Sequence, residues 1–189
     1  MSTTRPSEPL PALRVLLLPG WLDSGETHWQ TRWERLHGDR RVTQDDWVWP
    51  KRGDWMARLE DVLLEETTPA VLVAHSLGCH LVAAWAAHSR HRDRVAAALL
   101  VALPDVERSD MPPQLAPWRP IVRERLPFPS TAVVSADDPY CAPERAAEMA
   151  AQWGSELVSV GARGHLNGES GLGDWPEGRE LLQALVTRV

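Results

Sequence analysis

Ser76 is the main candidate in this sequence for a chemically reactive residue. It lies in the stretch Ala74-His75-Ser76-Leu77-Gly78. Residues 70–74 before it form a short, valine-rich apolar run, which is typical of a buried parallel strand. Residues 79–87 after it are rich in alanine and favour a helix. A serine on a tight turn from a strand into a helix fits a nucleophile elbow, where the hydroxyl is exposed above free helix N–H groups.

The stretch departs from the usual elbow pattern G-x-S-x-G at one place, because Ala74 stands where the first glycine is expected. Small residues flank the serine in this pattern because the strand and helix backbones nearly touch there, and alanine is the smallest departure. A simpler interpretation is that Ser76 merely caps the N-terminus of the helix. The stretch alone leaves both interpretations open.

A serine hydroxyl near neutral pH needs a base, and the base needs an orienting acid. His165 ends the glycine-rich turn 161–165, which follows the last expected strand, and Asp138 follows the strand before that. The order serine, aspartate, histidine resembles the order found in α/β-hydrolases. We therefore predict a catalytic triad of Ser76 as nucleophile, Asp138 as acid and His165 as base.

Each partner also has an ordinary interpretation. A single loop histidine such as His165 is usually solvent-exposed, and an aspartate before proline is usually a turn former. Asp137 competes with Asp138 for the acid role, and only one of the two can face the base. We favour Asp138 because Pro139 stiffens its backbone. His75 adjoins the serine, but neighbours on a strained turn diverge, so we do not expect it to be the base.

Two backbone N–H groups are expected to form an oxyanion hole. One belongs to Leu77, directly after the serine, and the other to Trp21, in the Pro19-Gly20-Trp21 loop that ends the first strand. We also expect the side chains of Trp21, Trp118 and Tyr140 to line a substrate pocket.

The sequence alternates between apolar runs and amphipathic stretches. Strands are expected at 13–18, 41–43, 70–74, 96–103, 131–135 and 156–160. Helices are expected at 26–36, with Thr27 as N-cap, and at 54–66, 79–87, 143–153 and 177–187. The proline-rich segment 105–129 is expected to be a loop with a short helix near 118–124.

This alternation predicts a three-layer α/β/α sandwich with a mostly parallel sheet of about six strands. Ligand sites in such sheets lie at the carboxyl ends of the strands, where all the candidate residues fall. At 189 residues, the chain is expected to hold a short flexible tail (1–12) and a single domain (13–189). The tail has no apolar stretch typical of a signal peptide.

The formal net charge of −6 argues against nucleic acid or an anionic membrane as the main partner. No apolar run is long enough to cross a bilayer, and no histidine or cysteine spacing indicates a metal site. Cys79 and Cys141 are the only cysteines, which favours two reduced thiols in the cytoplasm. The proposed chemistry requires no cofactor, and the oligomeric state stays open.

Four motifs together resemble the small serine hydrolases of the retinoblastoma-binding protein nine family and its bacterial relatives. They are Pro-Gly-Trp after the first strand, His-Ser-Leu-Gly-Cys at the elbow, Asp-Asp-Pro-Tyr and Gly-His-Leu-Asn. The resemblance extends from about Val15 to Leu185. It implies a minimal α/β-hydrolase fold without a large lid, and the same roles for Ser76, Asp138 and His165. The Leu-x-Cys-x-Glu motif by which the human namesake binds the retinoblastoma protein is missing, so that partner is not expected.

These observations predict a serine hydrolase that acts through an acyl-enzyme on small acyl esters, with amides as a second substrate class. A shallow, tryptophan-edged site suits short acyl groups better than long lipids. The alternative is a catalytically weak binding or scaffold protein with the same fold, because one fold hosts many functions.

Overall fold

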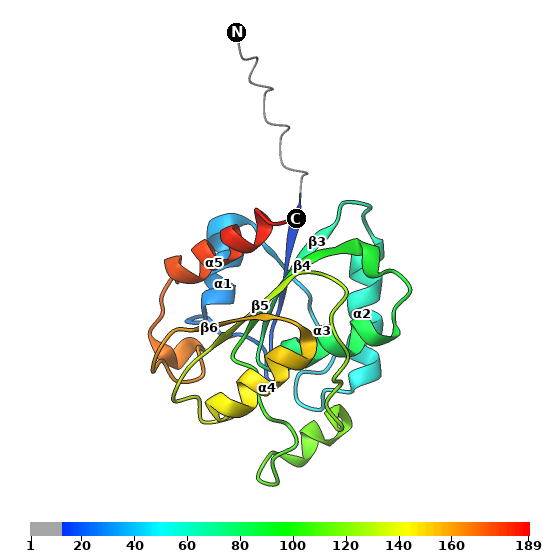
Figure 1. Cartoon of the computed structure of the whole chain (residues 1–189). Helices are drawn as coiled ribbons and strands as arrows, with labels where there is room; N and C mark the ends of the chain where they lie inside the picture. The colour runs from blue at the N-terminus through cyan, green and yellow to red at the C-terminus, as the bar shows by residue number, and fades with distance from the viewer. Residues whose placement is uncertain (1–12) are drawn as a thin grey trace.

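The computed structural model describes residues 13–189; the tail expected at 1–12 lies outside this range. The described residues form a six-stranded sheet in the order β2-β1-β3-β4-β5-β6, with every neighbouring pair parallel (Figure 1). The strands are β1 (Arg14–Leu18), β2 (Arg40–Arg41), β3 (Ala70–His75), β4 (Val95–Val101), β5 (Ser130–Val134) and β6 (Glu156–Ser159). The expected parallel sheet is confirmed.

Helices cover both faces of the sheet (Figure 1). The α-helices are α1 (Trp29–His37), α2 (Arg52–Leu64), α3 (Leu77–His88), α4 (Pro143–Trp153) and α5 (Pro176–Val186). Short 3-10 helices are η1 (Arg92–Arg94), η2 (Pro113–Trp118) and η3 (Gly168–Ser170). Helices α2, α3 and α4 contribute to one buried cluster and α1 and α5 to another, which confirms the three layers.

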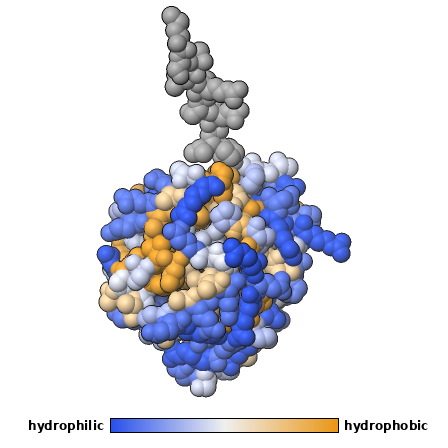
Figure 2. Space-filling view, in the orientation of Figure 1, coloured by the Kyte–Doolittle hydropathy of each residue, from blue (hydrophilic) through white to orange (hydrophobic). Residues whose placement is uncertain are grey.

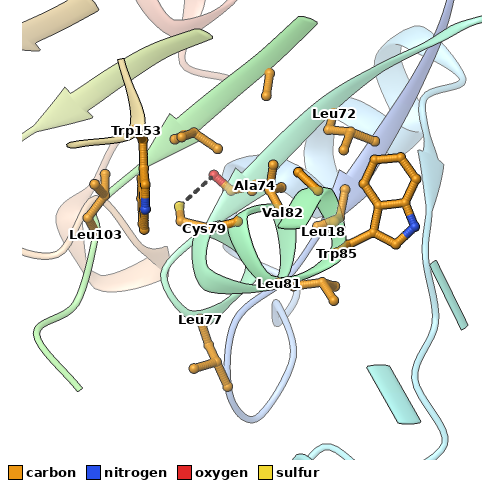
Figure 3. Close-up of a cluster of buried hydrophobic side chains, with 14 of the residues drawn as sticks. Leu18, Leu72, Ala74, Leu77, Cys79, Leu81, Val82, Trp85, Leu103 and Trp153 are labelled. Atoms are coloured by element: carbon orange, nitrogen blue, oxygen red, sulfur yellow. Dashed lines mark hydrogen bonds between the residues drawn. The ribbon is translucent and has the colours of Figure 1, made fainter. Parts of the chain in front are cut away.

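The central strand β3 shows how the two clusters are divided. All of its residues are buried. Leu72 and Ala74 belong to the cluster under α2, α3 and α4, whereas Val71 and Val73 belong to the cluster under α1 and α5. Successive side chains of a strand point to opposite faces, so a strand covered on both sides is apolar throughout. Figure 3 shows the first cluster around α3, where the Sγ of Cys79 donates to the carbonyl oxygen of Ala74 at 3.6 Å.

Buried tryptophans join helices to loops. The indole N–H of Trp29 in α1 donates to the carbonyl oxygen of Leu166 at 2.8 Å, and the indole N–H of Trp118 donates to that of Pro50 at 2.8 Å. Both side chains are 1% exposed. Buried indoles need such acceptors, so each bond fixes a loop to the core. The bond from Trp29 holds the loop that carries His165.

Most element boundaries differ from the sequence predictions by one or two residues, and the differences at η2, α1 and β2 bear on the site or on how the elements were assigned. The short helix expected near 118–124 is wrong: the helical turn is η2, which begins just after Pro112 and ends at Trp118. Helix α1 begins at Trp29, with His28 rather than Thr27 as N-cap. The imidazole Nδ1 of His28 accepts from the N–H of Gln30, a role more often filled by serine, threonine or aspartate. Strand β2 is shifted and spans two residues.

The surface is mainly hydrophilic on the side drawn in Figure 2, with smaller apolar areas between the polar residues. Across residues 13–189, every helix is too short or too polar to span a lipid bilayer.

Candidate active site

Ser76 lies on the turn between β3 and α3, at the carboxyl end of a central strand. Its backbone has φ 54° and ψ −123°, a positive φ that is uncommon for a residue other than glycine. Its N–H donates to the carbonyl oxygen of Val101 in β4 at 2.9 Å. Its side chain makes no capping hydrogen bond to α3, so the helix-cap interpretation is wrong. The strained turn instead leaves the hydroxyl available to other groups.

Two glycines allow the close packing around this turn. A Cβ atom on Gly78 would lie 2.3 Å from the carbonyl oxygen of Leu18, and one on Gly20 would lie 2.7 Å from the Cβ of Ser76. Both distances are shorter than real Cβ contacts, so neither position accepts a side chain without a shift of the backbone. Ala74 is fully buried. The elbow thus keeps its second glycine and replaces the first with the smallest side chain.

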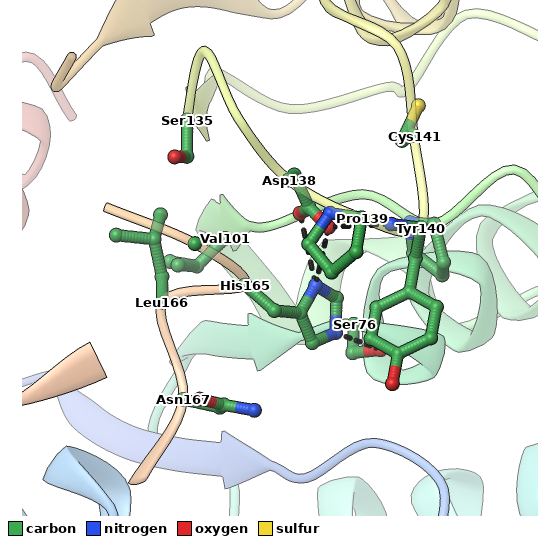
Figure 4. Close-up of polar contacts among 12 residues, drawn as sticks. Ser76, Val101, Ser135, Asp138, Pro139, Tyr140, Cys141, His165, Leu166 and Asn167 are labelled. Atoms are coloured by element: carbon green, nitrogen blue, oxygen red, sulfur yellow. Dashed lines mark hydrogen bonds and ion pairs between the residues drawn. The ribbon is translucent and has the colours of Figure 1, made fainter. Parts of the chain in front are cut away.

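His165 lies between Ser76 and Asp138 (Figure 4). Its Nε2 is 2.9 Å from the Oγ of Ser76, and its Nδ1 is 2.9 Å from both carboxylate oxygens of Asp138. A carboxylate only accepts hydrogen bonds, so the hydrogen of the neutral ring sits on Nδ1. Nε2 is then free to accept the hydroxyl hydrogen of Ser76. The side chains of His165 and Asp138 are 9% and 4% exposed, so both contacts are shielded from water.

Asp137 and Asp138 leave β5 in different directions. One oxygen of Asp137 accepts from the hydroxyl of Ser135 and from the N–H of Gly164, each at 2.8 Å. The bond from Ser135 and then that from Gly164 lower the pKa of Asp137 below its ordinary value. Asp137 therefore anchors the loop just before His165, while Asp138 contacts the imidazole itself.

His75 has a role that sequence reasoning missed. Its Nε2 donates to the carbonyl oxygen of His165 at 2.9 Å, and the two rings lie edge to face with centroids 4.9 Å apart. Burial lowers the pKa of His75 well below its ordinary value, so the ring stays neutral, and the carbonyl acceptor places its one hydrogen on Nε2. The residue before the serine thus holds the main chain of the predicted base. Its position beside Ser76 was the only signal in the sequence.

A cavity of about 320 Å³ opens onto Ser76 and His165. Trp21 and Tyr140 line it, and the ring of Tyr140 lies edge to face on His165 with centroids 4.6 Å apart. Trp118 does not line it; its indole is buried against Trp55, with ring centroids 5.4 Å apart. The prediction for Trp118 is therefore wrong. Its place in the wall is taken by side chains that lie just before η2 or within it: Met111, Pro112 and Leu115.

The backbone N–H groups of Trp21 and Leu77 both lie at residues that line this cavity. Within residues 13–189, neither N–H donates to a protein acceptor. Leu77 is the first residue of α3, where N–H groups have no partner inside the helix. Two unpaired donors beside a serine hydroxyl are suited to binding a negatively charged oxygen.

The part of the chain that the structure describes has no group of three or more histidine, cysteine, aspartate or glutamate side chains placed to hold a metal ion.

A family model described as "Serine hydrolase" matches residues 15–184. The chain belongs to this serine hydrolase family. The comparison with curated proteins found no significant match.

Solved structures agree with this assignment. A YdeN-like hydrolase from Pectobacterium atrosepticum is 30% identical with a TM-score of 0.82, over 93% of this chain and 91% of that one. The ydeN gene product of B. subtilis is 18% identical with a TM-score of 0.71, over 93% and 100%. A monoacylglycerol lipase from Paleococcus ferrophilus is 14% identical with a TM-score of 0.66, over 96% of each chain. This serine hydrolase has a minimal α/β-hydrolase fold with no large lid.

Proposed function

We propose that this serine hydrolase is a carboxylesterase for small acyl esters, with Ser76 as nucleophile, His165 as general base and Asp138 as the orienting acid. The observation that carries the proposal is the continuous set of 2.9 Å contacts from Asp138 through His165 to Ser76, on a strained turn at the cavity. His165 lies 27 residues from Asp138 and 89 residues from Ser76 along the chain, yet the three side chains are in contact there. A structural role for Ser76 explains neither the strain nor the contacts.

In the first step, Nε2 of His165 takes the hydroxyl hydrogen as Oγ of Ser76 attacks the ester carbonyl carbon. The C=O π bond opens, and its electron pair moves onto the oxygen. Asp138 keeps the hydrogen of the ring on Nδ1 and stabilises the imidazolium that forms. The N–H groups of Trp21 and Leu77 donate to the oxyanion.

Collapse of this intermediate breaks the bond to the alcohol. The imidazolium returns its proton to the leaving oxygen, and the acyl group stays on Ser76. Water then enters, His165 takes its proton, and the second tetrahedral intermediate collapses to release the acid and restore the serine hydroxyl. Every proton is carried by His165, and no cofactor is consumed.

The cavity supports small substrates. Its volume of about 320 Å³ falls at the small end of ligand pockets, and its apolar wall of Met111, Pro112 and Leu115 suits a short acyl chain. Amides would use the same steps with a poorer leaving group. Both cysteines are buried and free, which fits a reducing compartment, and we propose the cytoplasm as location.

The test is covalent labelling with a fluorophosphonate probe, followed by hydrolysis of p-nitrophenyl esters of increasing chain length. We expect the native protein to be labelled and to hydrolyse short-chain esters fastest. Ser76→Ala should remove labelling and lower kcat by about 10⁶-fold. A folded native protein that is neither labelled nor active would instead be the binding protein of the alternative interpretation. A rate that peaks at long acyl chains would contradict the substrate size.

A further inference from the structure

Ser76 follows β3, which lies between β1 and β4 in the sheet, so the cavity has a β1 side and a β4 side. The residues that line these two sides differ chemically. On the β4 side, Pro104, Met111, Pro112 and Leu115 line the cavity and carry no side-chain donor, and Tyr140, from the segment after β5, is the one described lining residue on that side with a hydroxyl group. On the β1 side, the lining includes Asp23, His28 and Asn167. Asn167 reaches this side because its loop packs on the turn just before α1: a Cβ on Gly168 would lie 2.6 Å from the Oγ1 of Thr27. We call the β1 side, formed by Asp23, His28 and Asn167, the polar flank.

The orientation of the Asn167 amide is fixed by its role as N-cap of η3. Its Oδ1 accepts from the N–H of Glu169 at 3.0 Å. Only the oxygen can accept this bond, so the other arm of the amide is the NH₂ group. Among residues 13–189, that Nδ2 has no acceptor, and it is not enclosed by protein. In Figure 4 the amide nitrogen extends from the backbone on the side where Ser76 lies. Asn167 thus presents a free donor at the cavity.

His28 repeats this arrangement on the same flank. It is the N-cap of α1, and its Nδ1 accepts from the N–H of Gln30 at 3.1 Å. The hydrogen of the neutral ring therefore sits on Nε2, which is buried and has no acceptor in the described chain. His28 is 5% exposed, and burial lowers its pKa to about 3, so it carries no positive charge near neutral pH. Buried donors without acceptors are rare outside functional sites.

The remaining charge on the flank is neutralised within the protein. The carboxylate of Asp23 pairs with the guanidinium of Arg41, with 2.7 Å between Oδ1 and Nη1. The polar flank therefore offers neutral N–H donors and no free cation, so it suits an uncharged oxygen acceptor rather than a carboxylate or phosphate.

The proton transfer from His165 indicates which part of the ester, the alcohol or the acyl group, lies on the polar flank. His165 must return its proton to the leaving oxygen, so that oxygen lies within hydrogen-bond reach of Nε2. Asn167 is two residues beyond His165 on the same loop, and His28 contacts His75, which holds that loop, with ring centroids 4.6 Å apart.

We infer that the polar flank binds the leaving alcohol, with the amide of Asn167 donating a hydrogen bond to an uncharged oxygen of that alcohol. The β4 side then holds a short apolar acyl chain. The substrate class is thus a short-chain ester of an alcohol that carries an ether, hydroxyl or carbonyl oxygen. This inference rests on the proposed esterase function and makes it more specific.

The experiment compares two pairs of esters, each differing by one CH₂ replaced with oxygen. The first pair places the oxygen in the alcohol: butyl butanoate and 2-methoxyethyl butanoate. The second places it in the acyl chain: butyl pentanoate and butyl 3-methoxypropanoate. The readout is the ratio of kcat/KM within each pair, in native enzyme and in variants. Intrinsic reactivity and any general effect of a substitution on catalysis cancel when ratios are compared.

Asn167→Ser is the main variant, because serine also caps a helix turn but lacks the amide donor. Asn167→Asp keeps the capping oxygen and replaces the NH₂ with an acceptor. We expect the preference for the methoxyethyl ester to fall about tenfold in Asn167→Ser, and further in Asn167→Asp. The acyl pair should keep its ratio. Met111→Ala, on the opposite wall, is the matched control and should leave the alcohol-pair ratio unchanged.

Unchanged alcohol-pair ratios in an active enzyme would overturn the inference. A change confined to the acyl pair would overturn the assignment of the flank to the alcohol. If the native enzyme hydrolyses none of the four esters and fails to react with the fluorophosphonate probe, the proposed function itself fails, a result distinct from equal ratios in an active enzyme.

Discussion

Asp137 and Asp138 are adjacent carboxylates that contact different parts of the site. Asp138 contacts the imidazole of His165, whereas Asp137 accepts from Ser135 and from the N–H of Gly164. Neutral asparagine at either position keeps the size of the side chain and one carbonyl oxygen. The pair therefore offers a matched test of which carboxylate supports the base.

We expect Asp138→Asn to lower kcat on p-nitrophenyl butyrate by about 10³–10⁴-fold, because an amide facing Nδ1 favours the wrong tautomer of His165. Asp137→Asn keeps an acceptor for the N–H of Gly164, and its loss should be less than about tenfold. Steady-state kinetics of both variants measure this difference. If both variants lose the same activity, or if Asp137→Asn loses more, Asp138 is not the acid that supports His165.

His75 gives a second prediction at the scale of single residues. Its Nε2–H donates to the carbonyl oxygen of His165, and a ring without this donor leaves that carbonyl unpaired. We expect His75→Phe to lower kcat by about 10–100-fold through misplacement of His165, with a smaller effect on KM. His75→Gln retains a donor at the same reach and should recover most of the activity.

Thermal melts of both variants separate this effect from misfolding. If His75→Gln and His75→Phe lose activity equally while both stay folded, the bond to His165 does not position the base.

At the scale of elements, the elbow depends on β1 and α3 approaching each other closely. Gly78 makes this possible, since a Cβ there would lie 2.3 Å from the carbonyl oxygen of Leu18. Gly53, in the first turn of α2, has nothing within 4 Å of an added Cβ. The two glycines therefore differ in packing while both lie near the start of a helix.

Gly78→Ala should lower the free energy of unfolding by about 1–3 kcal/mol, because β1 and α3 must separate. It should also lower kcat, since the N–H of Leu77 moves with the helix. Gly53→Ala should be neutral or stabilising by up to about 1 kcal/mol, because alanine favours a helix over glycine. Urea unfolding and ester kinetics measure both effects. A Gly78→Ala protein as stable and active as the Gly53→Ala protein would contradict the close approach.

The elements that carry the site were predictable because they are continuous in sequence. The apolar run at 70–74 and the alanine-rich run after Ser76 specify β3 and α3 through periodicity and composition alone. The order of Ser76, Asp138 and His165 along strand ends then predicted their meeting point. Parallel sheets make such predictions possible, because the ends of neighbouring strands share one edge.

What could not be predicted depends on packing between distant segments. Trp118 was expected in the pocket, but its indole donates to Pro50 and is buried against Trp55, contacts that no local pattern indicates. His28 was missed as an N-cap because histidine rarely fills that position. The tie from His75 to the carbonyl of His165 joins residues 90 positions apart. Each miss concerns a side chain whose partner is fixed only by the folded sheet.

For the whole molecule, burial of neutral histidines links stability to pH. Burial lowers the pKa of His28 to about 3 and that of His80 to about 4, and it lowers the pKa of His75 well below the ordinary value of 6.5. Below pH 6.5 the unfolded chain takes up protons at these positions, whereas the folded chain does not. Stability is therefore full above pH 6.5 and falls as the pH drops toward the folded pKa values.

His80 isolates one part of this effect because it lies away from the cavity lining. Its Nε2 is 2.7 Å from the carbonyl oxygen of Pro104, and glutamine can donate to the same oxygen without titrating. Each buried neutral histidine costs about 1.4 kcal/mol of unfolding free energy per pH unit below pH 6.5. Between pH 7.5 and pH 5, native protein should therefore lose about 2 kcal/mol more than His80→Gln. Urea unfolding at both pH values measures this difference, with His37→Gln, at an exposed histidine, as the matched control. If native protein and His80→Gln lose stability in parallel, His80 takes up its proton in the folded protein as readily as in the unfolded chain.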